Sequence, residues 1–338
     1  MNRPLLVICD TERDYCRRLD EYLRDHLNLS FEICSFTDTE IFKEFVKEKI
    51  PALSVLSQSV YLALSERGSI RNVDNILVLD EAVSFVNEDR EQEEEKNVCH
   101  ISKYLPAGRI IDGILDFCVK IPGNIGNLDA ERVAEKVKLL GLFSPLSRCG
   151  QTAFAVKMCE ELSKHGKTML LNFDSFSMIA EMMGQDAEED ISDLLYYAEC
   201  EESKFSVYLE RIKRSAKGFD FIPPAKTAAM IKEITFDRIK TLTELLAESA
   251  GYEYIILDLS EFPDGLCDIL RICTRVFTIV GEGRAEKYKF EQYTKVLNLN
   301  GYDDVLANTV RCLISDASYV DLSSYASKML VREAIVSE

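Results

Sequence analysis

The 338-residue chain is poor in the residues that build metal centres, and it has no long apolar segment. Its three histidines, His26, His100 and His165, are scattered, and its eleven cysteines include no C-x-x-C pair, so no zinc cluster is predicted. No run approaches the roughly 18 apolar residues of a membrane span. The N-terminus, MNRPLLVICDTERD, has acidic residues too close to its short apolar run for a signal peptide. These absences predict a cytoplasmic protein with reduced thiols.

Basic residues are also scarce, because 40 Lys and Arg stand against 58 Asp and Glu, which gives a formal charge of -18. Such a charge repels nucleic-acid phosphates and anionic lipids, so we expect no nucleic-acid partner and only indirect membrane contact. The tail Leu322–Val336 has only Lys328 and Arg332 as bases, which favours a packed C-terminal helix over a membrane-binding one.

Short apolar runs alternate with helical patterns over residues 1–120. The expected strands are Leu5–Asp10, Phe31–Ser35, Ala52–Ser57, Asn75–Leu79 and Val98–Tyr104, and the expected helices are Thr11–His26, Thr39–Lys49, Val60–Arg67 and Gly108–Val119. This alternation predicts a doubly wound, flavodoxin-like α/β domain. The acidic run at residues 87–97 (NEDREQEEEKN) predicts a solvated loop or flexible helix, and residues 121–134 predict a linker that begins with IPGNIGNLD.

A second alternating segment covers residues 135–338. The expected strands are Val137–Phe143, Thr168–Phe173, Gly218–Pro223, Tyr254–Leu259 and Val276–Val280, and the expected helices are Thr152–His165, Ile191–Ala198, Ser206–Lys217, Phe236–Gly251 and Lys287–Asn298. Nearly continuous apolar strands predict a mostly parallel sheet that is covered on both faces, and therefore a second doubly wound domain. Ala307–Arg311 is only a poor candidate for a late strand.

Three polar residues of the first domain lie at or near the ends of predicted strands: Asp10, Ser57 and Lys103. Pro106 follows Lys103 closely. This arrangement resembles response-regulator receiver domains over about residues 1–118. The resemblance places the acidic pair of receivers at Cys9-Asp10, so one acid is missing here, and it places the phosphoacceptor at Ser57. Because serine stands where receivers need a carboxylate, it implies a pseudo-receiver, and we expect a dimerisation or docking module with Asp10, Ser57 and Lys103 at its former site.

The stretch GLFSPLSRCGQTAFAVKMCEELSKHGKTMLLNFD, which starts at Gly141, resembles the opening of the ParA/MinD family of P-loop ATPases. The resemblance extends over about residues 135–290. The implied nucleotide-binding residues are Ser147, Arg148, Cys149, Gly150, Gln151, Thr152 and Ala153. Thr152, Asp174 and Asp258 are the implied Mg²⁺ residues, and Asp174 is the weak catalytic candidate for positioning water.

Both lysines of the family's phosphate loop are replaced, by Leu146 and Gln151. Since a charge-assisted contact with phosphate contributes about 1.5–3 kcal/mol, we expect ATP and Mg²⁺ to bind weakly or not at all. Efficient ATP hydrolysis is not expected, because it requires charge neutralisation in the transition state. Two interpretations of Arg148 stay open: it contacts a phosphate, or it fills the space that ATP would occupy.

A receiver-like domain ahead of a ParA/MinD-like domain is similar to the architecture of CpaE-like proteins. The resemblance implies a homodimeric localisation, assembly or regulatory factor that acts through protein contacts with a pilus or secretion machine. One alternative is a nucleotide-dependent dimerisation switch that binds Mg–ATP with slow or no hydrolysis. Another is an atypical response regulator.

Overall fold

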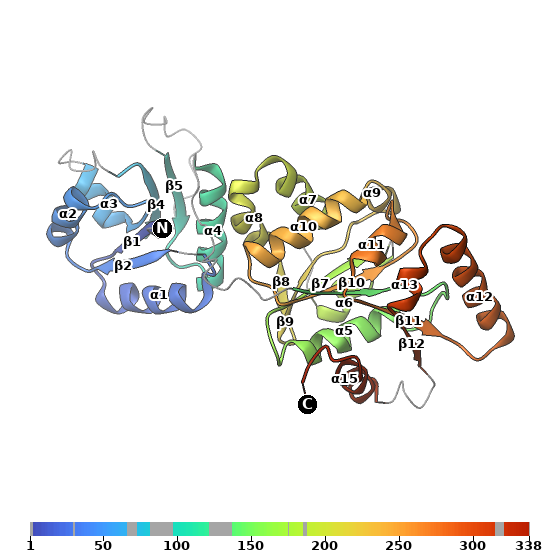
Figure 1. Ribbon diagram of the computed structural model, residues 1–338. Coiled ribbons are helices and arrows are strands. Elements are labelled where there is room, and N and C mark those ends of the chain that lie inside the picture. The colour runs from blue at the N-terminus through green and yellow to red at the C-terminus, as the bar shows by residue number, and fades with distance from the viewer. Residues whose placement is uncertain are drawn as a thin grey trace. The chain divides into compact units, whose positions relative to one another are not determined.

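The computed structural model describes residues 3–29, 31–65, 73–81, 97–121, 137–174, 176–184, 188–314 and 321–337. Apart from Asn97, the predicted acidic loop lies outside these residues, and so does the predicted linker apart from Ile121. The described chain forms two compact α/β units, the first built on strands β1–β5 and the second on β6–β12 (Figure 1). No helix of the described residues is long and apolar enough to cross a membrane.

The first unit is a parallel five-stranded sheet with the strand order β2-β1-β3-β4-β5. Its strands are β1 (Leu5–Cys9), β2 (Glu32–Phe36), β3 (Leu53–Ser57), β4 (Asn75–Asp80) and β5 (Asn97–Ser102). Its helices are α1 (Arg13–His26), α2 (Thr39–Glu48), α3 (Gln58–Ser65) and α4 (Ala107–Lys120). This order is the doubly wound, flavodoxin-like order that the sequence predicts.

Each face of this sheet has its own apolar core. Residues of α1 and α4, such as Leu19 and Ile114, pack with Leu6 and Ile8 on one face. Residues of α2 and α3 pack with Val7 and Cys9 on the other face. Because neighbours along a strand point to opposite faces, the fully buried run LLVIC of β1 supplies both cores.

The second unit is a seven-stranded sheet with the order β12-β11-β6-β10-β7-β9-β8, in which only the β8–β9 pair is antiparallel. Its strands are β6 (Lys138–Leu142), β7 (Thr168–Phe173), β8 (Arg214–Ala216), β9 (Phe219–Ile222), β10 (Tyr254–Leu259), β11 (Arg275–Val280) and β12 (Thr309–Leu313). Parallel pairing of β6, β10 and β7 confirms the predicted mostly parallel sheet.

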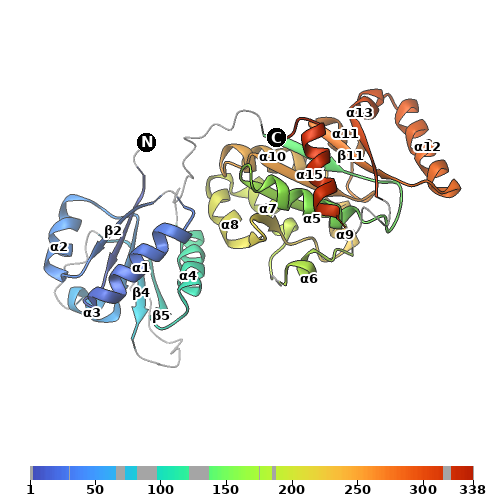
Figure 2. The ribbon, with the colours of Figure 1, turned by 90° about the horizontal axis from the view of Figure 1, so that it is seen from below.

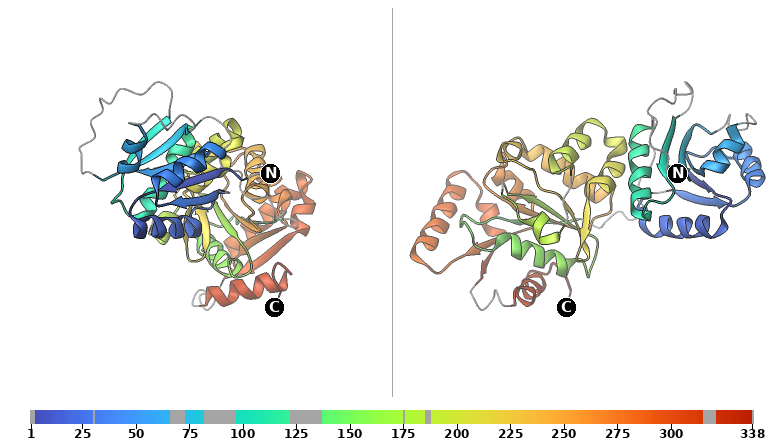
Figure 3. Two further views of the ribbon diagram at one scale, coloured as in Figure 1. Left: turned by 90° about the vertical axis from the view of Figure 1, so that its left-hand side faces the viewer. Right: turned by 180° about the vertical axis from the view of Figure 1, so that it is seen from behind.

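Helices cover both faces of this sheet (Figures 1 and 2). They are α5 (Gln151–Leu162), α6 (Ile179–Met183), α7 (Ile191–Cys200), α9 (Ala228–Lys232), α10 (Phe236–Glu248), α11 (Leu266–Ile272), α12 (Arg284–Leu299), α13 (Asp303–Ala307) and α15 (Leu322–Arg332), with a short 3₁₀ turn at Glu202–Lys204. Ser206–Arg211 of the remaining helix, α8 (Phe205–Ile212), belong to the first unit. Helices α5 and α15 lie on one face, and α7, α10 and α11 lie on the other; the view from behind in Figure 3 shows the same layers.

The tail forms the packed helix that the sequence predicts. Ala326, Met329 and Leu330 of α15 are buried in one core cluster with Phe154 and Val156 of α5. The apolar face of α15 is therefore occupied by the rest of its own unit.

The sequence misplaced two elements of the second unit and did not predict its short helices α6, α9, α11 and α13. The expected helix Ser206–Lys217 ends at Ile212, and β8 follows, because Lys217 and Gly218 take positive φ values of 54° and 91° and turn the chain back into β9. The poor late-strand candidate is the true strand β12. Its period-two pattern, with Val310 and Cys312 buried, is hidden by the polar residues between them.

Candidate functional site: a loop at the carboxyl edge of the second sheet

The carboxyl ends of β6, β10 and β7 meet at one edge of the second sheet. Asp258 of β10 pairs with Leu142 of β6 on one side and with Asn172 of β7 on the other. Residues 143–150 leave this edge as a loop and lead into α5, which begins at Gln151. The strand–loop–helix unit and the polar strand ends that the sequence predicted therefore lie together.

The loop presents the amino end of α5 without a side-chain cap. The N-cap residue is Gly150, with a φ of 80°. Glycine has no side chain that could accept a hydrogen bond from the first turn of the helix. Arg148 also has a positive φ, of 55°. Ser147 and Arg148 are exposed. Unpaired N–H groups and the helix dipole at such an end favour an anion, so the backbone of this loop fits a phosphate group.

Gln151 does not point out to solvent from this loop. Its Nε2 donates to Oδ1 of Asp258 at 2.7 Å, to the carbonyl of Leu259 at 2.9 Å and, more weakly, to the carbonyl of Leu142 at 3.3 Å. The side chain therefore joins the start of α5 to the ends of β6 and β10. A neutral amide in this position anchors the loop to the strand ends, but it places no positive charge near a bound phosphate.

Asp258 is the centre of a buried network and only 2 % exposed. Its second oxygen, Oδ2, accepts a hydrogen bond of 2.7 Å from Nδ2 of Asn172. Burial raises the pKa of the Asp258 carboxyl above its usual value, and the charge of Asp174 acts in the same direction. Hydrogen bonds from Gln151, Thr152 and Asn172 oppose this effect by stabilising the carboxylate.

The other predicted residues occupy different positions around this network. The backbone N–H of Asp174 donates to Oδ1 of Asn172 at 3.2 Å, and Oδ1 of Asp174 accepts from the N–H of Phe176 at 3.4 Å. Cys149 and Ala153 are half-buried against the apolar core, and burial raises the pKa of the Cys149 thiol. That thiol is therefore not a reactive thiolate.

Arg148 makes no hydrogen bond or ion pair with any residue that the structure describes, and its side chain is exposed. It is thus not packed into the loop. An exposed side chain agrees with both interpretations of the sequence, contact with a phosphate and occupation of the space of ATP, so both stay predictions.

The residues fit the two parts of a Mg–nucleotide unequally. The uncapped end of α5 suits phosphate, and Thr152 and Asp258 have the oxygens that Mg²⁺ prefers. However, both oxygens of Asp258 accept hydrogen bonds from the amides of Gln151 and Asn172. Each carboxylate oxygen keeps a second lone pair, so these hydrogen bonds restrict the position of a Mg²⁺ at Asp258 but do not exclude it.

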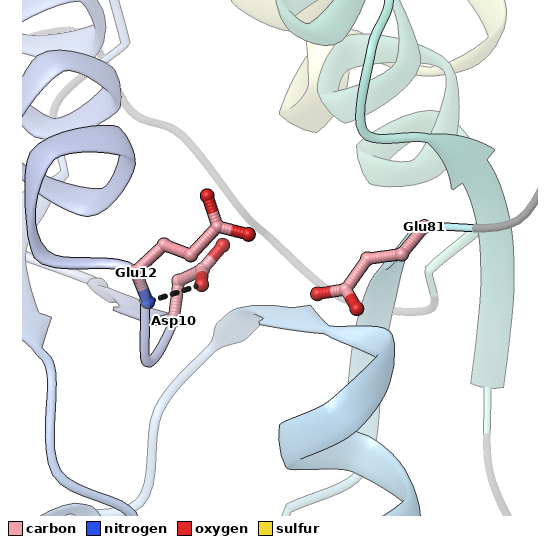
Figure 4. Close-up of side chains that lie close together, drawn as sticks. All are labelled: Asp10, Glu12 and Glu81. Atoms are coloured by element: carbon pink, nitrogen blue, oxygen red, sulfur yellow. Dashed lines mark hydrogen bonds between the residues drawn. The ribbon is translucent and has the colours of Figure 1, made fainter.

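The three sequence-predicted residues of the first unit meet a second charged cluster at the carboxyl edge of its own sheet. Lys103 is 1 % exposed, and its Nζ lies 2.8 Å from Asp10, 3.1 Å from Glu12 and 3.2 Å from Glu81. Figure 4 shows the three acids turned toward one another, with the N–H of Glu12 donating to Asp10. Ser57 is fully buried at the end of β3, and its hydroxyl lies 3.1 Å from that of Ser59.

Lys103 places one positive charge among three acids whose spacing would otherwise suit a metal ion, and so offsets part of their negative charge. Burial lowers the pKa of Lys103, but its hydrogen bonds with Asp10, Glu12 and Glu81 outweigh this effect and raise the pKa above its ordinary value. The ring of Tyr15 lies 4.7 Å below the ammonium group. The amine is therefore a permanent internal cation.

Sequence reasoning missed Glu12 and Glu81. The available signal is their position, because Glu12 follows β1 by three residues and Glu81 directly follows β4. In a parallel sheet such positions share one edge, so an acid at either one is a candidate for the site.

Both units are thus α/β folds with mostly parallel sheets, and the second carries a strand–loop–helix site at the carboxyl edge. No protein-family model matches the chain, and no curated protein matches it. Among solved structures, the chain is similar to a ParA family ATPase from Chlorobium tepidum, at 14% identity over 57% of this chain and 90% of that one, with a TM-score of 0.43.

Two further solved structures are similar to the chain at the same low level. One is the septum site-determining protein MinD from Pyrococcus horikoshii in complex with Mg-ADP, at 14% identity over 52% of this chain and 68% of that one, with a TM-score of 0.37. The other is cobyrinic acid a,c-diamide synthase from Mycobacterium smegmatis with ADP and magnesium, at 13% identity over 60% of this chain and 83% of that one, with a TM-score of 0.39.

Proposed function

We propose that the chain is a non-catalytic regulatory protein of the CpaE-like type, in which a receiver-like unit and a ParA/MinD-like P-loop unit act through protein contacts. The observation that carries the proposal is the position of Gln151, whose amide binds Asp258 and two strand-end carbonyls. In an active P-loop this position supplies the lysine that neutralises phosphate charge. Here the side chain is engaged inside the fold.

The cluster around Lys103 supports the same conclusion for the first unit. A receiver needs a carboxylate to accept phosphate and free acids to hold Mg²⁺. The position of the acceptor is the buried hydroxyl of Ser57, and the nearby acids pair with Lys103. Both units therefore keep the shape of a switch protein, with the amide of Gln151 and the ammonium group of Lys103 engaged inside the fold. We propose that they form a homodimer and dock on a pilus or secretion machine.

A nucleotide-dependent switch is the second candidate, and one observation favours it. The uncapped α5 terminus and the exposed Arg148 leave backbone N–H groups and one cation available to a phosphate. In this alternative the loop holds a nucleotide without turning it over quickly, and the bound form dimerises.

Calorimetric titration with ATP and Mg²⁺ separates the two candidates. The non-catalytic proposal expects no ATP to bind at the loop, so any heat of binding at millimolar ATP should be the same for the wild-type chain, Arg148→Gln and Asp258→Ala. Submillimolar binding that is lost in Arg148→Gln or in Asp258→Ala would refute it and support the switch. Thermal unfolding of each variant shows whether a loss of binding reflects a loss of the fold. A steady-state assay for phosphate release on the same samples tests directly for turnover.

A further inference from the structure

A cavity of about 510 Å³ lies in the second unit, and neither Gln151 nor Asp258 lines it. It lies between α12 and the strands β11 and β12, and its lining includes Val280 and Gly281 at the end of β11 and Arg311 of β12. This volume falls in the range of small-molecule sites. None of the residues assigned to the loop or to the Lys103 cluster lines it.

Positive charge is concentrated in this cavity, although the chain as a whole carries a charge of -18. Lys287, Lys295 and Arg311 line it together with a single acid, Glu291. Among the residues that the structure describes, none of these three cations has an ion pair. All three cations are exposed, so solvent screens their mutual repulsion, and their net positive charge favours an anionic ligand at this hollow.

An aromatic ring forms part of the wall beside these charges. The guanidinium carbon of Arg311 lies 4.7 Å from the ring centroid of Phe290. The nearby hydroxyl of Thr294 donates to the carbonyl of Phe290 at 3.0 Å, so it turns its methyl group and not its donor toward other neighbours. A guanidinium that stacks on a ring presents a flat surface on which a second planar group can stack.

Gly281 allows α12 to pack closely against the end of β11 at one end of the cavity. A Cβ at this residue would meet Oε2 of Glu286 at 2.1 Å. The same carboxylate accepts the N–H of Gly283 at 2.8 Å and so closes the first turn of α12. The wall of the cavity that α12 supplies is thereby fixed against the end of β11.

We infer that this cavity is a second binding site, which takes a small organic anion with a planar ring, the chemical class of nucleoside phosphates. The cations Lys287, Lys295 and Arg311 bind the anionic group. The Arg311–Phe290 stack binds the ring. The cavity volume favours a small molecule over a segment of protein.

Titration of the full chain with adenosine 5′-monophosphate tests this inference, and inorganic pyrophosphate serves as an anion without a ring. We expect one molecule of adenosine monophosphate per chain, and weaker binding of pyrophosphate. Arg311→Gln should weaken the binding of adenosine monophosphate by at least about tenfold, because one charge-assisted contact and the stack are lost. Lys287→Gln should weaken it severalfold, and since Lys287 is exposed, that variant should fold normally.

Lys289→Gln is the matched control, because Lys289 is exposed on the same helix but does not line the cavity. The inference is overturned if neither probe binds at millimolar concentration, or if Lys289→Gln weakens binding as much as Lys287→Gln. It is also overturned if Arg148→Gln abolishes the binding of adenosine monophosphate while Arg311→Gln leaves it unchanged, since the probe would then occupy the loop. Equal affinity for pyrophosphate would refute the ring contact.

Discussion

Replacement of Gln151 tests the network beneath the loop most directly. Gln151→Ala removes the donor to Asp258 Oδ1 at 2.7 Å and the donor to Leu259 at 2.9 Å. A hydrogen bond to a charged group contributes about 1.5–3 kcal/mol and a neutral one about 0.5–1.5 kcal/mol. The free energy of unfolding of the second unit should therefore fall by about 2–4 kcal/mol, which corresponds to about 4–16 °C in its melting temperature.

Gln151→Glu adds a test of sign. It places a second carboxylate next to the buried Asp258, whose pKa is already raised by burial. Two adjacent buried carboxylates raise the folded-state pKa of the pair further. Because the folded pKa lies above the unfolded one, the lost stability returns as the pH falls through the folded pKa. Gln151→Glu should therefore be less stable than Gln151→Ala at pH 7, and the difference should shrink as the pH is lowered.

Differential scanning calorimetry of the full chain, with circular dichroism as a second probe, measures these changes. The matched control is Gln292→Ala, because Gln292 is also a glutamine in a helix of this unit and makes no side-chain hydrogen bond with the described residues. Its melting temperature should stay close to that of the wild-type chain. If Gln151→Ala melts with the control, or if Gln151→Glu is as stable as the wild type at pH 7, Gln151 does not fix Asp258.

Three further predictions concern the charged cluster and the loop. Lys103→Met should destabilise the first unit by about 3–5 kcal/mol, because Asp10 stays buried without its cation. Asp10→Asn in the same chain should restore part of this loss. Equal stability of the single and the double variant in chemical unfolding would contradict the prediction. Gly150→Ala should lower the free energy of unfolding by about 1 kcal/mol, because residue 150 has a φ of 80°, which alanine adopts only with strain. An unchanged melting temperature would show that the loop relaxes freely. Arg148→Ala should leave the melting temperature unchanged, since the side chain is exposed, and a drop of several degrees would show that it packs in the fold.

Much of the fold could be predicted because strand and helix patterns are local. Buried runs such as LLVIC and YIILDL are apolar along their whole length, and they form β1 and β10 as expected. The elements that were missed lack this local signal. Strand β8 has only three residues, and β12 alternates buried and exposed positions within a polar context.

The sequence by itself determined two α/β units, the positions of their long apolar strands, the lack of lysine in the loop and the absence of a carboxylate at Ser57. Only the tertiary structure decided that Gln151 turns inward onto Asp258, 107 residues away, and that Glu12 shares Lys103, 91 residues away. The physical reason is that the type of residue sets which bonds a side chain can make. The packing of distant strand ends then decides which partners lie within reach, and so whether a charge is available to a ligand or is satisfied inside the fold.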